Sequence, residues 1–443
     1  MRIVIVGAGA VGSYLADRLS TEGQDVVVIE NDAARAAEIQ ENLDALVLTG
    51  NGASAITLRE AGVEQADLVI AASNSDGVNA LACHTAHGLG VDRTVARIED
   101  PDLRAGLEDL GVDVVIDPGE MAAHEVEDLV SQRGVFDVIE FASGRLTLVG
   151  GIARDGSPML GRTIADLRAA DQDAEWAVTA VVRGGETIPV RGHTTVREND
   201  HVLMMVATED LQTTRRLLGL GDEQVERVVI LGSTRVGELA CDMLLARNLD
   251  VVIVDPDVDR CRFLADQHPK ALVLAGDPTD PAVLGDLGLV DTDVIAALSG
   301  WDEVNLTGCL VGKALGAGTA ISRFHRLSYV GLLIGTGIDA AVSSRLSAVN
   351  AILRFVRRGR IRSVATFKDT QAEALDIEVE PGSAACAQHL RDLDLPPTAV
   401  IGGVVRVEEA FVPTGDTQIR EGDRLVVFAA PDAITSVEAL CTT

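Results

Sequence analysis

Two glycine-rich segments carry the clearest chemical signal in this 443-residue chain. The first, Ile3-Val4-Ile5-Val6-Gly7-Ala8-Gly9-Ala10-Val11-Gly12, has the Gly-x-Gly-x-x-Gly spacing of a nucleotide-binding turn. Gly7 permits a tight turn out of a strand, Gly9 lets the backbone approach a phosphate, and Gly12 lets the following helix pack closely. That helix would present free N–H groups and its positive dipole end to the phosphate. The predicted contacts therefore lie on Gly7, Ala8, Gly9, Ala10, Val11 and Gly12.

The second segment repeats this pattern, with Gly232 standing 225 positions after Gly7. It comprises Gly232, Ser233, Thr234, Arg235, Val236 and Gly237. Thr234 replaces the middle glycine, so its side chain is expected where backbone must approach the phosphate, and Arg235 could compensate with a charge-assisted contact. The alternative is that this copy has lost its ligand and kept the fold.

The agreement extends well beyond the glycines and indicates a duplicated domain. Asp255 matches Glu30 at the same shift, and a shift of 226 relates Asn51 to Asp277 and Arg97 to Arg323. Ligands bind at the carboxyl ends of parallel strands, so residues at predicted strand ends complete the two sites. They are Glu30, Gly50, Asn51, Ser73, Asn74 and Arg97 in the first copy, and Asp255, Asp277, Ser299 and Arg323 in the second.

The six residues of the first copy have specific expected partners. Glu30 would accept hydrogen bonds from both ribose hydroxyls and repel a 2′-phosphate, which favours NAD or an adenine nucleotide over NADP. Gly50-Asn51 would lie beside the adenine, and Ser73-Asn74 beside the phosphates or a second nucleoside. Arg97 is the only cation expected at these strand ends and would contact phosphate.

Short alternating strand and helix patterns must position these residues. Strands Arg2–Val6, Val26–Glu30, Ala45–Leu48, Leu68–Ala72, Thr94–Ile98 and Val114–Ile116 alternate with helices, including Pro101–Leu110. This alternation predicts an α/β fold: two Rossmann-like doubly wound parallel-sheet domains, each followed by a small α+β module. The expected boundaries are 1–136, 137–219, 225–360 and 361–443.

A longer helix leaves each predicted sheet, over about 121–132 and 343–358. The second carries an apolar stripe of Leu346, Val349, Ile352, Leu353 and Val356. A stripe on a helix that leaves a complete sheet needs a partner surface. We expect self-association, with packing inside the same chain as the alternative.

Composition excludes several other classes. No constellation of catalytic or metal-ligating residues can be assembled, and the six cysteines are too far apart for a zinc or disulfide framework. No apolar run is long enough to span a bilayer, and a strand starting at Arg2 leaves no space for a signal peptide, so we expect a cytosolic protein.

The chain is strongly acidic, with a formal net charge of −31 and only three lysines. Nucleic acid binding needs a basic face and is not expected. An acidic surface with arginine in place of lysine is typical of a protein from a high-salt cytoplasm, where counterions screen self-repulsion. A GC-rich genome is the alternative explanation.

The chain resembles the TrkA family, the regulatory subunits of Trk-type potassium uptake systems built from tandem RCK (regulator of potassium conductance) units. The specific segments are Ser299-Gly300-Trp301-Asp302-Glu303-Val304-Asn305, Tyr329 to Asp339, Gly359, and Leu395-Pro396-Pro397-Thr398-Ala399-Val400-Ile401-Gly402-Gly403-Val404-Val405-Arg406. Gly77 and Thr234 depart from the family pattern.

The resemblance implies a non-enzymatic subunit that senses NAD(H) or ATP/ADP. It implies a dimer or tetramer ring that gates a TrkH-like integral-membrane potassium transporter or channel subunit from the inner face of the cell membrane. A gating module of another cation channel or antiporter is one alternative, and an NAD-dependent oxidoreductase is a weaker one. Of the two glycine segments, the first is expected to be the stronger nucleotide site.

Overall fold

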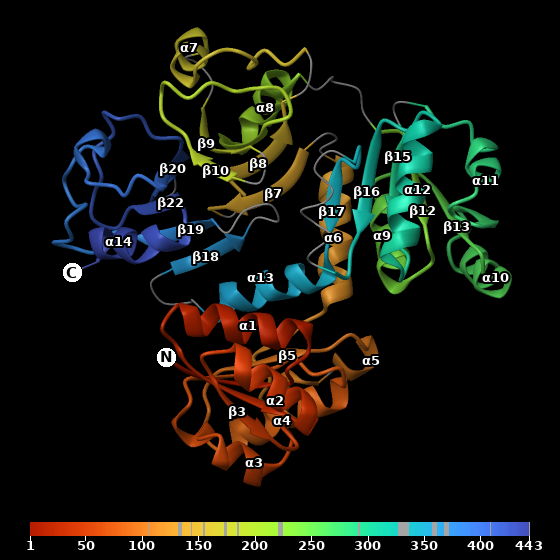
Figure 1. Ribbon diagram of the computed structural model, residues 1–443, viewed down its shortest axis with the longest axis horizontal. Helices are drawn as coiled ribbons and strands as arrows, with labels where there is room; N and C mark the ends of the chain where they lie inside the picture. The colour runs from red at the N-terminus through yellow and green to blue at the C-terminus, as the bar shows by residue number, and fades with distance from the viewer. Residues whose placement is uncertain are drawn as a thin grey trace. The chain divides into compact units, whose positions relative to one another are not determined.

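The computed structural model describes residues 1–104, 106–131, 135–142, 144–153, 156–171, 175–183, 186–219, 225–290, 293–326, 336–356, 361–366, 372–407 and 409–442. The predicted family segment Tyr329 to Asp339 is described only from residue 336, and Gly359 lies outside the described residues. Two parallel and two antiparallel sheets form in the described ranges, which confirms the predicted fold class (Figure 1).

The first parallel sheet has the order β3-β2-β1-β4-β5-β6. Its strands are β1 (Arg2–Val6), β2 (Asp25–Glu30), β3 (Leu46–Thr49), β4 (Leu68–Ala71), β5 (Thr94–Arg97) and β6 (Val114–Ile116). Its helices are α1 (Ala10–Thr21), α2 (Ala33–Asn42), α3 (Ala55–Glu60), α4 (Asp76–Gly88) and α5 (Pro101–Arg104). The order reverses between β1 and β4, where a doubly wound sheet opens a crevice at its carboxyl edge.

Local sequence explains these elements. The run Val26–Ile29 is almost fully buried, as a strand covered on both faces requires. Helix α2 starts where the Asp32 carboxylate accepts hydrogen bonds from the backbone of Ala34 and Arg35. The predicted helix Pro101–Leu110 is wrong in length, because Gly106 adopts φ +85° and α5 ends before it.

The second parallel sheet repeats the arrangement in the order β14-β13-β12-β15-β16-β17. Its strands are β12 (Arg227–Leu231), β13 (Asp250–Asp255), β14 (Leu272–Ala275), β15 (Val294–Ala297), β16 (Thr319–Arg323) and β17 (Ala340–Val342). Its helices are α9 (Arg235–Ala246), α10 (Val258–Gln267), α11 (Pro281–Gly285) and α12 (Asp302–Ala314). The switch point here lies between β12 and β15.

The two small modules are antiparallel sheets with helices. The first has β7 (Val135–Phe141), β8 (Leu146–Ile152), β9 (Trp176–Arg183), β10 (Glu186–Pro189), β11 (His201–Ala207), α7 (Ile164–Ala170) and α8 (Leu211–Leu218). The second has β18 (Ile361–Thr366), β19 (Glu373–Glu378), β20 (Ala399–Arg406), β21 (Glu409–Phe411), β22 (Arg424–Ala429) and α14 (Pro431–Cys441). Their strand orders are β10-β9-β11-β8-β7 and β18-β19-β22-β20-β21.

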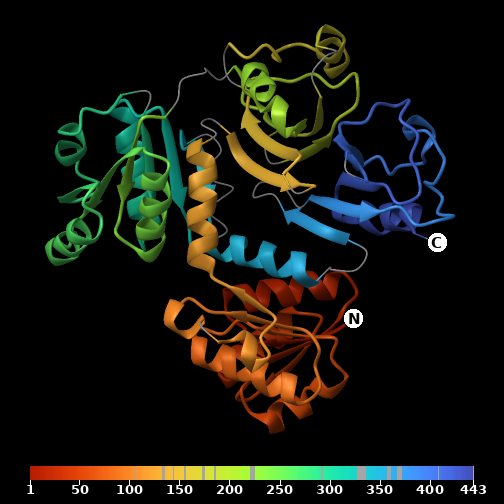
Figure 2. The same ribbon diagram turned by 180° about the vertical axis from the view of Figure 1, so that it is seen from behind.

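These modules pack on each other through one shared apolar cluster (Figures 1 and 2). A Cβ added to Gly402 would lie 2.7 Å from the Thr179 side chain, and one added to Gly403 would lie 2.7 Å from the Leu146 side chain. The glycine pair on β20 therefore lets the two sheets approach closely.

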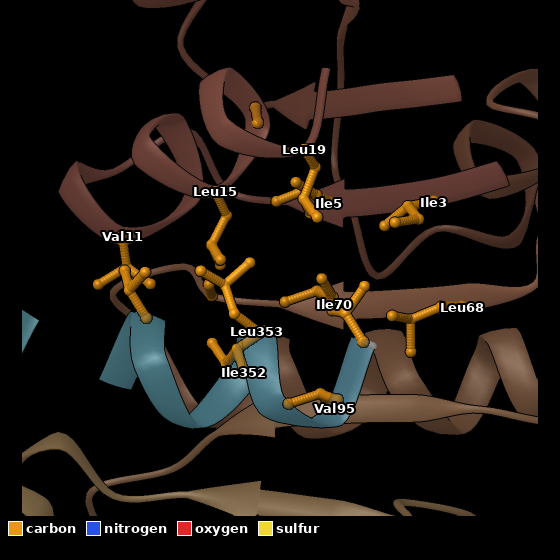
Figure 3. Packing of buried hydrophobic residues seen from close by; sticks show 14 of the residues in the cluster. Ile3, Ile5, Val11, Leu15, Leu19, Leu68, Ile70, Val95, Ile352 and Leu353 are labelled. Atoms are coloured by element: carbon orange, nitrogen blue, oxygen red, sulfur yellow. The ribbon is translucent and has the colours of Figure 1, made fainter. Parts of the chain in front are cut away.

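Helix α13 (Ser344–Val356) follows the second parallel sheet but completes the first. By contacts, the chain forms one unit of Met1–Ala122 with Ser343–Val356 and another of Ala123–Val342 with Arg357–Thr443. Ile352 and Leu353 are fully buried against α1, beside Leu15 (Figure 3). The Arg93 guanidinium binds the carbonyl of Phe355 at the end of α13 and stacks on its ring at 4.7 Å.

The expectation that the stripe on this helix mediates self-association is therefore wrong. The stripe needs a partner surface, as its periodicity indicates, but α1 and the first parallel sheet of the same chain supply it. Packing within the chain is more favourable than association with a second copy, because it buries the same apolar side chains without the entropy loss of association.

Helix α6 (Pro118–Ser131) follows the first parallel sheet. From Ala123 onward it belongs to the other unit, where both views draw it beside the second parallel sheet (Figures 1 and 2). The Arg247 guanidinium at the end of α9 donates to the Glu127 carboxylate at 2.6 Å. Each nucleotide domain thus sends its last helix away from its own sheet.

Candidate functional site

The first glycine segment forms a turn between β1 and α1 in which two positions accept only glycine. Gly7 has φ +93°, and a Cβ added there would lie 2.7 Å from the Ser73 backbone. A Cβ on Gly12 would lie 1.9 Å from the Gly7 carbonyl oxygen. Both glycines are therefore required by the turn and by the close start of α1.

Gly9 is different because nothing in the fold excludes a side chain there. An added Cβ would meet only the Asn74 amide oxygen, at 3.8 Å, and φ is −65°. Gly9 is the N-cap of α1, and no side chain caps this helix. Its first turn is therefore open to an anion, as the nucleotide prediction requires.

Glu30 lies at the end of β2 and holds this turn. Its buried carboxylate accepts from the Ala8 N–H at 2.7 Å and from the Asp32 N–H at 3.0 Å. A carboxylate has about four lone-pair sites, so it keeps acceptor capacity for ribose hydroxyls. Ribose recognition by Glu30 stays a prediction, and holding the glycine turn is a role that sequence reasoning missed.

The remaining predicted residues of the first copy lie at neighbouring strand ends. The Gly50 N–H donates to the Glu30 carbonyl at 2.8 Å, which places the β3 loop beside β2. The Asn51 side chain accepts from the Ala53 N–H at 3.0 Å. Arg97 approaches the Asn74 side chain at 3.5 Å and forms an ion pair with Glu99.

A buried asparagine that we did not predict as a site residue locks two strand ends together. Asn79, on α4, accepts from the Ser73 N–H at 2.9 Å and donates to the carbonyls of Ser73 at 3.0 Å and Arg97 at 2.8 Å. Asn305 repeats the clamp, donating to Ser299 at 3.1 Å and Arg323 at 2.9 Å. Its signal in the sequence was the identity of the residue in both copies.

Arg97 was predicted as the only cation at the strand ends, but arginines on helices also contact the glycine turns. Arg35, on α2, donates its Nε–H to the Ala8 carbonyl at 2.8 Å. In the second copy, Arg260 on α10 approaches the Ser233 carbonyl at 3.4 Å and the Glu238 carboxylate at 2.6 Å. A helix-borne guanidinium therefore lies on each glycine turn.

The second copy reproduces the turn and its acidic support. Gly232 has φ +103°, and a Cβ on Gly237 would lie 2.4 Å from the Gly232 carbonyl oxygen. The Asp255 carboxylate accepts from the Ser233 N–H at 2.7 Å and from the Asp257 N–H at 2.9 Å. These bonds match those of Glu30.

Thr234 changes the start of α9. Its hydroxyl donates to the Leu298 carbonyl at 2.6 Å and accepts from the Gly237 N–H at 3.4 Å. Arg323 approaches the same oxygen at 3.4 Å. The Thr234 hydroxyl therefore caps α9, whereas its counterpart α1 starts at Gly9 without a cap. One N–H of the second turn that could bind an anion already has a partner.

Hydrogen bonds lower the carboxyl pKa of Asp277, a predicted residue of the second site, and of Asp302 at the start of α12. Asp277 follows β14, and hydrogen bonds from the Thr279 N–H and hydroxyl lower its carboxyl pKa. Burial acts to raise the pKa of Asp302, but hydrogen bonds from the backbone and ring of His325 and from the Arg326 N–H bring it below its usual value. Asp302 thereby fixes the loop after β16 to the start of α12.

The described residues contain no group of three or more His, Cys, Asp or Glu placed to hold a metal ion. All six cysteines are free thiols. A cavity of about 420 Å³ near β6 contains Arg104, whose guanidinium pairs with Asp117 at 2.8 Å and Glu120 at 2.7 Å. None of the residues predicted for the glycine-turn sites lines that cavity.

Duplicated glycine-turn domains, each followed by a small antiparallel module, define a tandem TrkA-N and TrkA-C protein. The TrkA-N domain model matches residues 3–118 and 228–344, and the TrkA-C domain model matches residues 153–219 and 375–442. The chain belongs to the TrkA family, as the resemblance predicted.

Relatives and solved structures agree with this assignment. The Trk system potassium uptake protein TrkA of Halomonas elongata is 32% identical over 437 residues, which cover 97% of this chain and 95% of the relative. The GsuK RCK domain has a TM-score of 0.61 at 19% identity and covers 99% of this chain and 94% of its own. The GsuK channel bound to NAD has a TM-score of 0.61 at 19% identity, over 99% of this chain and 78% of its own.

The expectation of a non-enzymatic protein is confirmed by these relatives, which are named for potassium uptake rather than for a reaction. In the part of the chain that the structure describes, no helix combines the length and hydropathy needed to cross a membrane.

Proposed function

We propose that this protein is the nucleotide-sensing regulatory subunit of a Trk-type potassium uptake system. NAD(H) or ATP/ADP binds at the glycine turns, and the bound state is transmitted to a TrkH-like integral-membrane subunit at the cytoplasmic face of the membrane. A nucleotide can switch such a system only through different affinities for two conformations. The four predicted segments, 1–136, 137–219, 225–360 and 361–443, act as two such sensor units in tandem.

The uncapped start of α1 is the observation that carries the proposal. Gly9 leaves the first turn of the helix without a side-chain cap, while Glu30 holds the preceding Ala8 N–H at 2.7 Å. A backbone anion site is thus kept open beside a carboxylate suited to a ribose. An ordinary structural helix would be stabilised by a few tenths of a kcal/mol if Ser, Thr or Asp replaced glycine at this N-cap.

Homo-oligomerisation as a dimer or tetramer ring belongs to this proposal, although it requires a surface other than the α13 stripe. Light scattering in molar KCl checks it, and a monomer at micromolar concentration would contradict it. High salt is the appropriate condition because the net charge of −31 produces self-repulsion that counterions screen.

Calorimetric titration of the full chain with NAD, NADH, ATP and ADP tests the binding step. The matched variant is Gly9→Thr, which copies Thr234 into a position where the fold has space for a Cβ. Binding by the wild type and a weakening of about 10- to 100-fold at the first site in Gly9→Thr would support the proposal. A wild type that binds none of these nucleotides would contradict it.

Potassium flux tests the gating step. Proteoliposomes with the membrane subunit are compared with and without this protein, at saturating and zero nucleotide. Flux should depend on nucleotide only when the protein is present, and Gly9→Thr should reduce that dependence. Flux unaffected by the protein would exclude the regulatory role.

A further inference from the structure

An exposed tryptophan marks the edge of the second glycine-turn site. Trp301 is the N-cap of α12, 71% of its surface is exposed, and its side chain makes no capping hydrogen bond. In the first copy Ser75 occupies this position and caps α4 by accepting from the Val78 N–H. The second copy therefore gives up a helix cap and exposes an indole.

The fold does not require the indole, because the loop backbone is the same in both copies. The Trp301 N–H donates to the Ser299 hydroxyl at 3.2 Å, and that hydroxyl donates to the Trp301 carbonyl at 3.3 Å. Ser73 makes the same two bonds with Ser75, each at 3.3 Å. Serine thus serves the loop as well as tryptophan does, and the indole calls for another explanation.

Position relates Trp301 to the ligand crevice. A Cβ added to Gly232 would lie 2.6 Å from the Ser299 backbone, so the loop that carries Trp301 touches the glycine turn. Strands β12 and β15 are neighbours at the switch point, and a ligand lies over that point. Asp255, the expected ribose partner, ends β13 on the other side of β12.

A guanidinium borders the intervening region. Arg323, at the end of β16, approaches the Thr234 hydroxyl at 3.4 Å. A ligand that reaches from Asp255 toward β15 would therefore carry its phosphates past a guanidinium.

We propose that Trp301 stacks on the second ring system of a dinucleotide bound at the second glycine turn. One nucleoside lies toward Asp255, the pyrophosphate crosses the start of α9, and the other ring lies on the indole. The second site then selects a dinucleotide of the NAD type over ADP, which has no ring to place on the β15 side. This inference rests on the proposed function, since it requires that the glycine turns bind nucleotides.

The expected effect follows from the energy of aromatic stacking. Base–aromatic stacking corresponds to about 5- to 150-fold in affinity. Trp301→Ser, which installs the residue of the first copy, should weaken NAD and NADH at the second site by such a factor and leave ADP unchanged. Trp301→Phe should retain part of the affinity, because a phenyl ring also stacks.

Fluorescence supplies a direct readout, since the chain has only two tryptophans and Trp176 is 1% exposed. In a Trp176→Phe chain, Trp301 emission should fall on addition of NAD or NADH and remain constant on addition of ADP. Because Trp176 is a core residue, calorimetry of Trp301→Ser in the otherwise unchanged chain provides an independent test. The same titrations in chains that also carry Gly9→Thr, which weakens the first site by about 10- to 100-fold, identify the binding step that belongs to the second site.

The outcomes separate this inference from the proposed function. If NAD still binds the second site with wild-type affinity in Trp301→Ser, the stacking inference is wrong and nucleotide sensing stands. Equal weakening of NAD and ADP would place the indole against the adenine and overturn the selectivity. If Trp301→Ser changes only assembly with the membrane subunit, the residue is a protein contact. Absence of nucleotide binding at both turns overturns both proposals.

Discussion

The two nucleotide domains share their framework and differ where a ligand would touch them. Gly7 and Gly232 make the same turn, and Asn79 and Asn305 join the same pairs of strand ends. These residues are required by packing and by buried hydrogen bonds. After duplication, substitution at such positions would have damaged the fold of either copy.

The positions around the open end of the crevice have diverged. The helix start is uncapped at Gly9 and capped by Thr234. The loop after the fourth strand presents Ser75 in one copy and an exposed Trp301 in the other. None of these differences alters the sheets, and under the proposed function they would give the two sites different ligands or affinities.

The largest expected effect concerns the helix that completes only the first domain. Ile352→Asp places an unpaired charge in the cluster between α13 and α1, and should destabilise the first domain by about 4 kcal/mol or more. Denaturant unfolding and loss of first-site binding measure it. Arg345→Gln, on the exposed side of the same helix, is the control. Release of smaller species without loss of stability would instead revive α13 as an oligomer contact.

The clamp asparagines should have the next largest effect. Asn79→Ala leaves the part-buried Ser73 N–H and Arg97 carbonyl without their partner, which costs about 1–3 kcal/mol for each unsatisfied group. Asn305→Ala should do the same in the second domain. Hydrogen exchange at the two strand ends would show whether each loss stays within its own domain. Equal loosening of both domains by either variant would contradict the independence of the two clamps.

The residues at the starts of α1 and α9 can be exchanged between the two copies. Gly9→Thr should weaken first-site nucleotide binding by about 10- to 100-fold, because the side chain caps α1 and narrows the approach of phosphate. Thr234→Gly should strengthen phosphate-dependent binding at the second site, at a cost of a few tenths of a kcal/mol in stability. Calorimetry follows both changes. A tighter first site in Gly9→Thr would reverse our ranking of the copies.

The smallest expected effect is a pH dependence confined to the second domain. The pKa of Asp302 is lowered in the folded protein, so its contribution to stability is present above its unfolded pKa of about 4 and is lost as pH falls through the folded value. Asp302→Asn should therefore be less stable than wild type at pH 5–7, and the difference should shrink in acid. Asp286→Asn, at an exposed carboxylate, is the control. A difference that grows in acid would refute the assignment.

Sequence patterns predicted the parts of the molecule that depend on local rules. Glycine spacing predicted both turns, because φ near +90° at Gly7 and Gly232 is a backbone requirement that the residue type reveals. Buried apolar runs predicted the parallel strands. The duplication reinforced each inference, since a chance motif would not recur with its strand-end residues at one shift.

The parts that sequence did not predict depend on contacts between distant segments. The stripe on α13 showed that a partner was needed, but periodicity cannot distinguish α1 of the same chain from a second copy. The hydroxyl of Thr234 was expected along the phosphate path, whereas it bonds to Leu298, which is 64 positions away. Arg35 was missed because its side chain reaches back from a helix rather than following a strand.

Helix α13 follows the second parallel sheet in the chain but packs on the first, and this arrangement sets the order in which the protein can fold. Ser344 lies 323 positions after the end of α1 at Thr21, so the ribosome releases the first parallel sheet long before its cover exists. Leu15 and Ile5 stay exposed to other nascent chains until most of the protein has been made. Contacts of such long sequence separation slow folding. The same arrangement means that a chain truncated before Ser344 lacks the cover of its N-terminal domain, so incomplete synthesis leaves an apolar surface for chaperones and proteases to recognise.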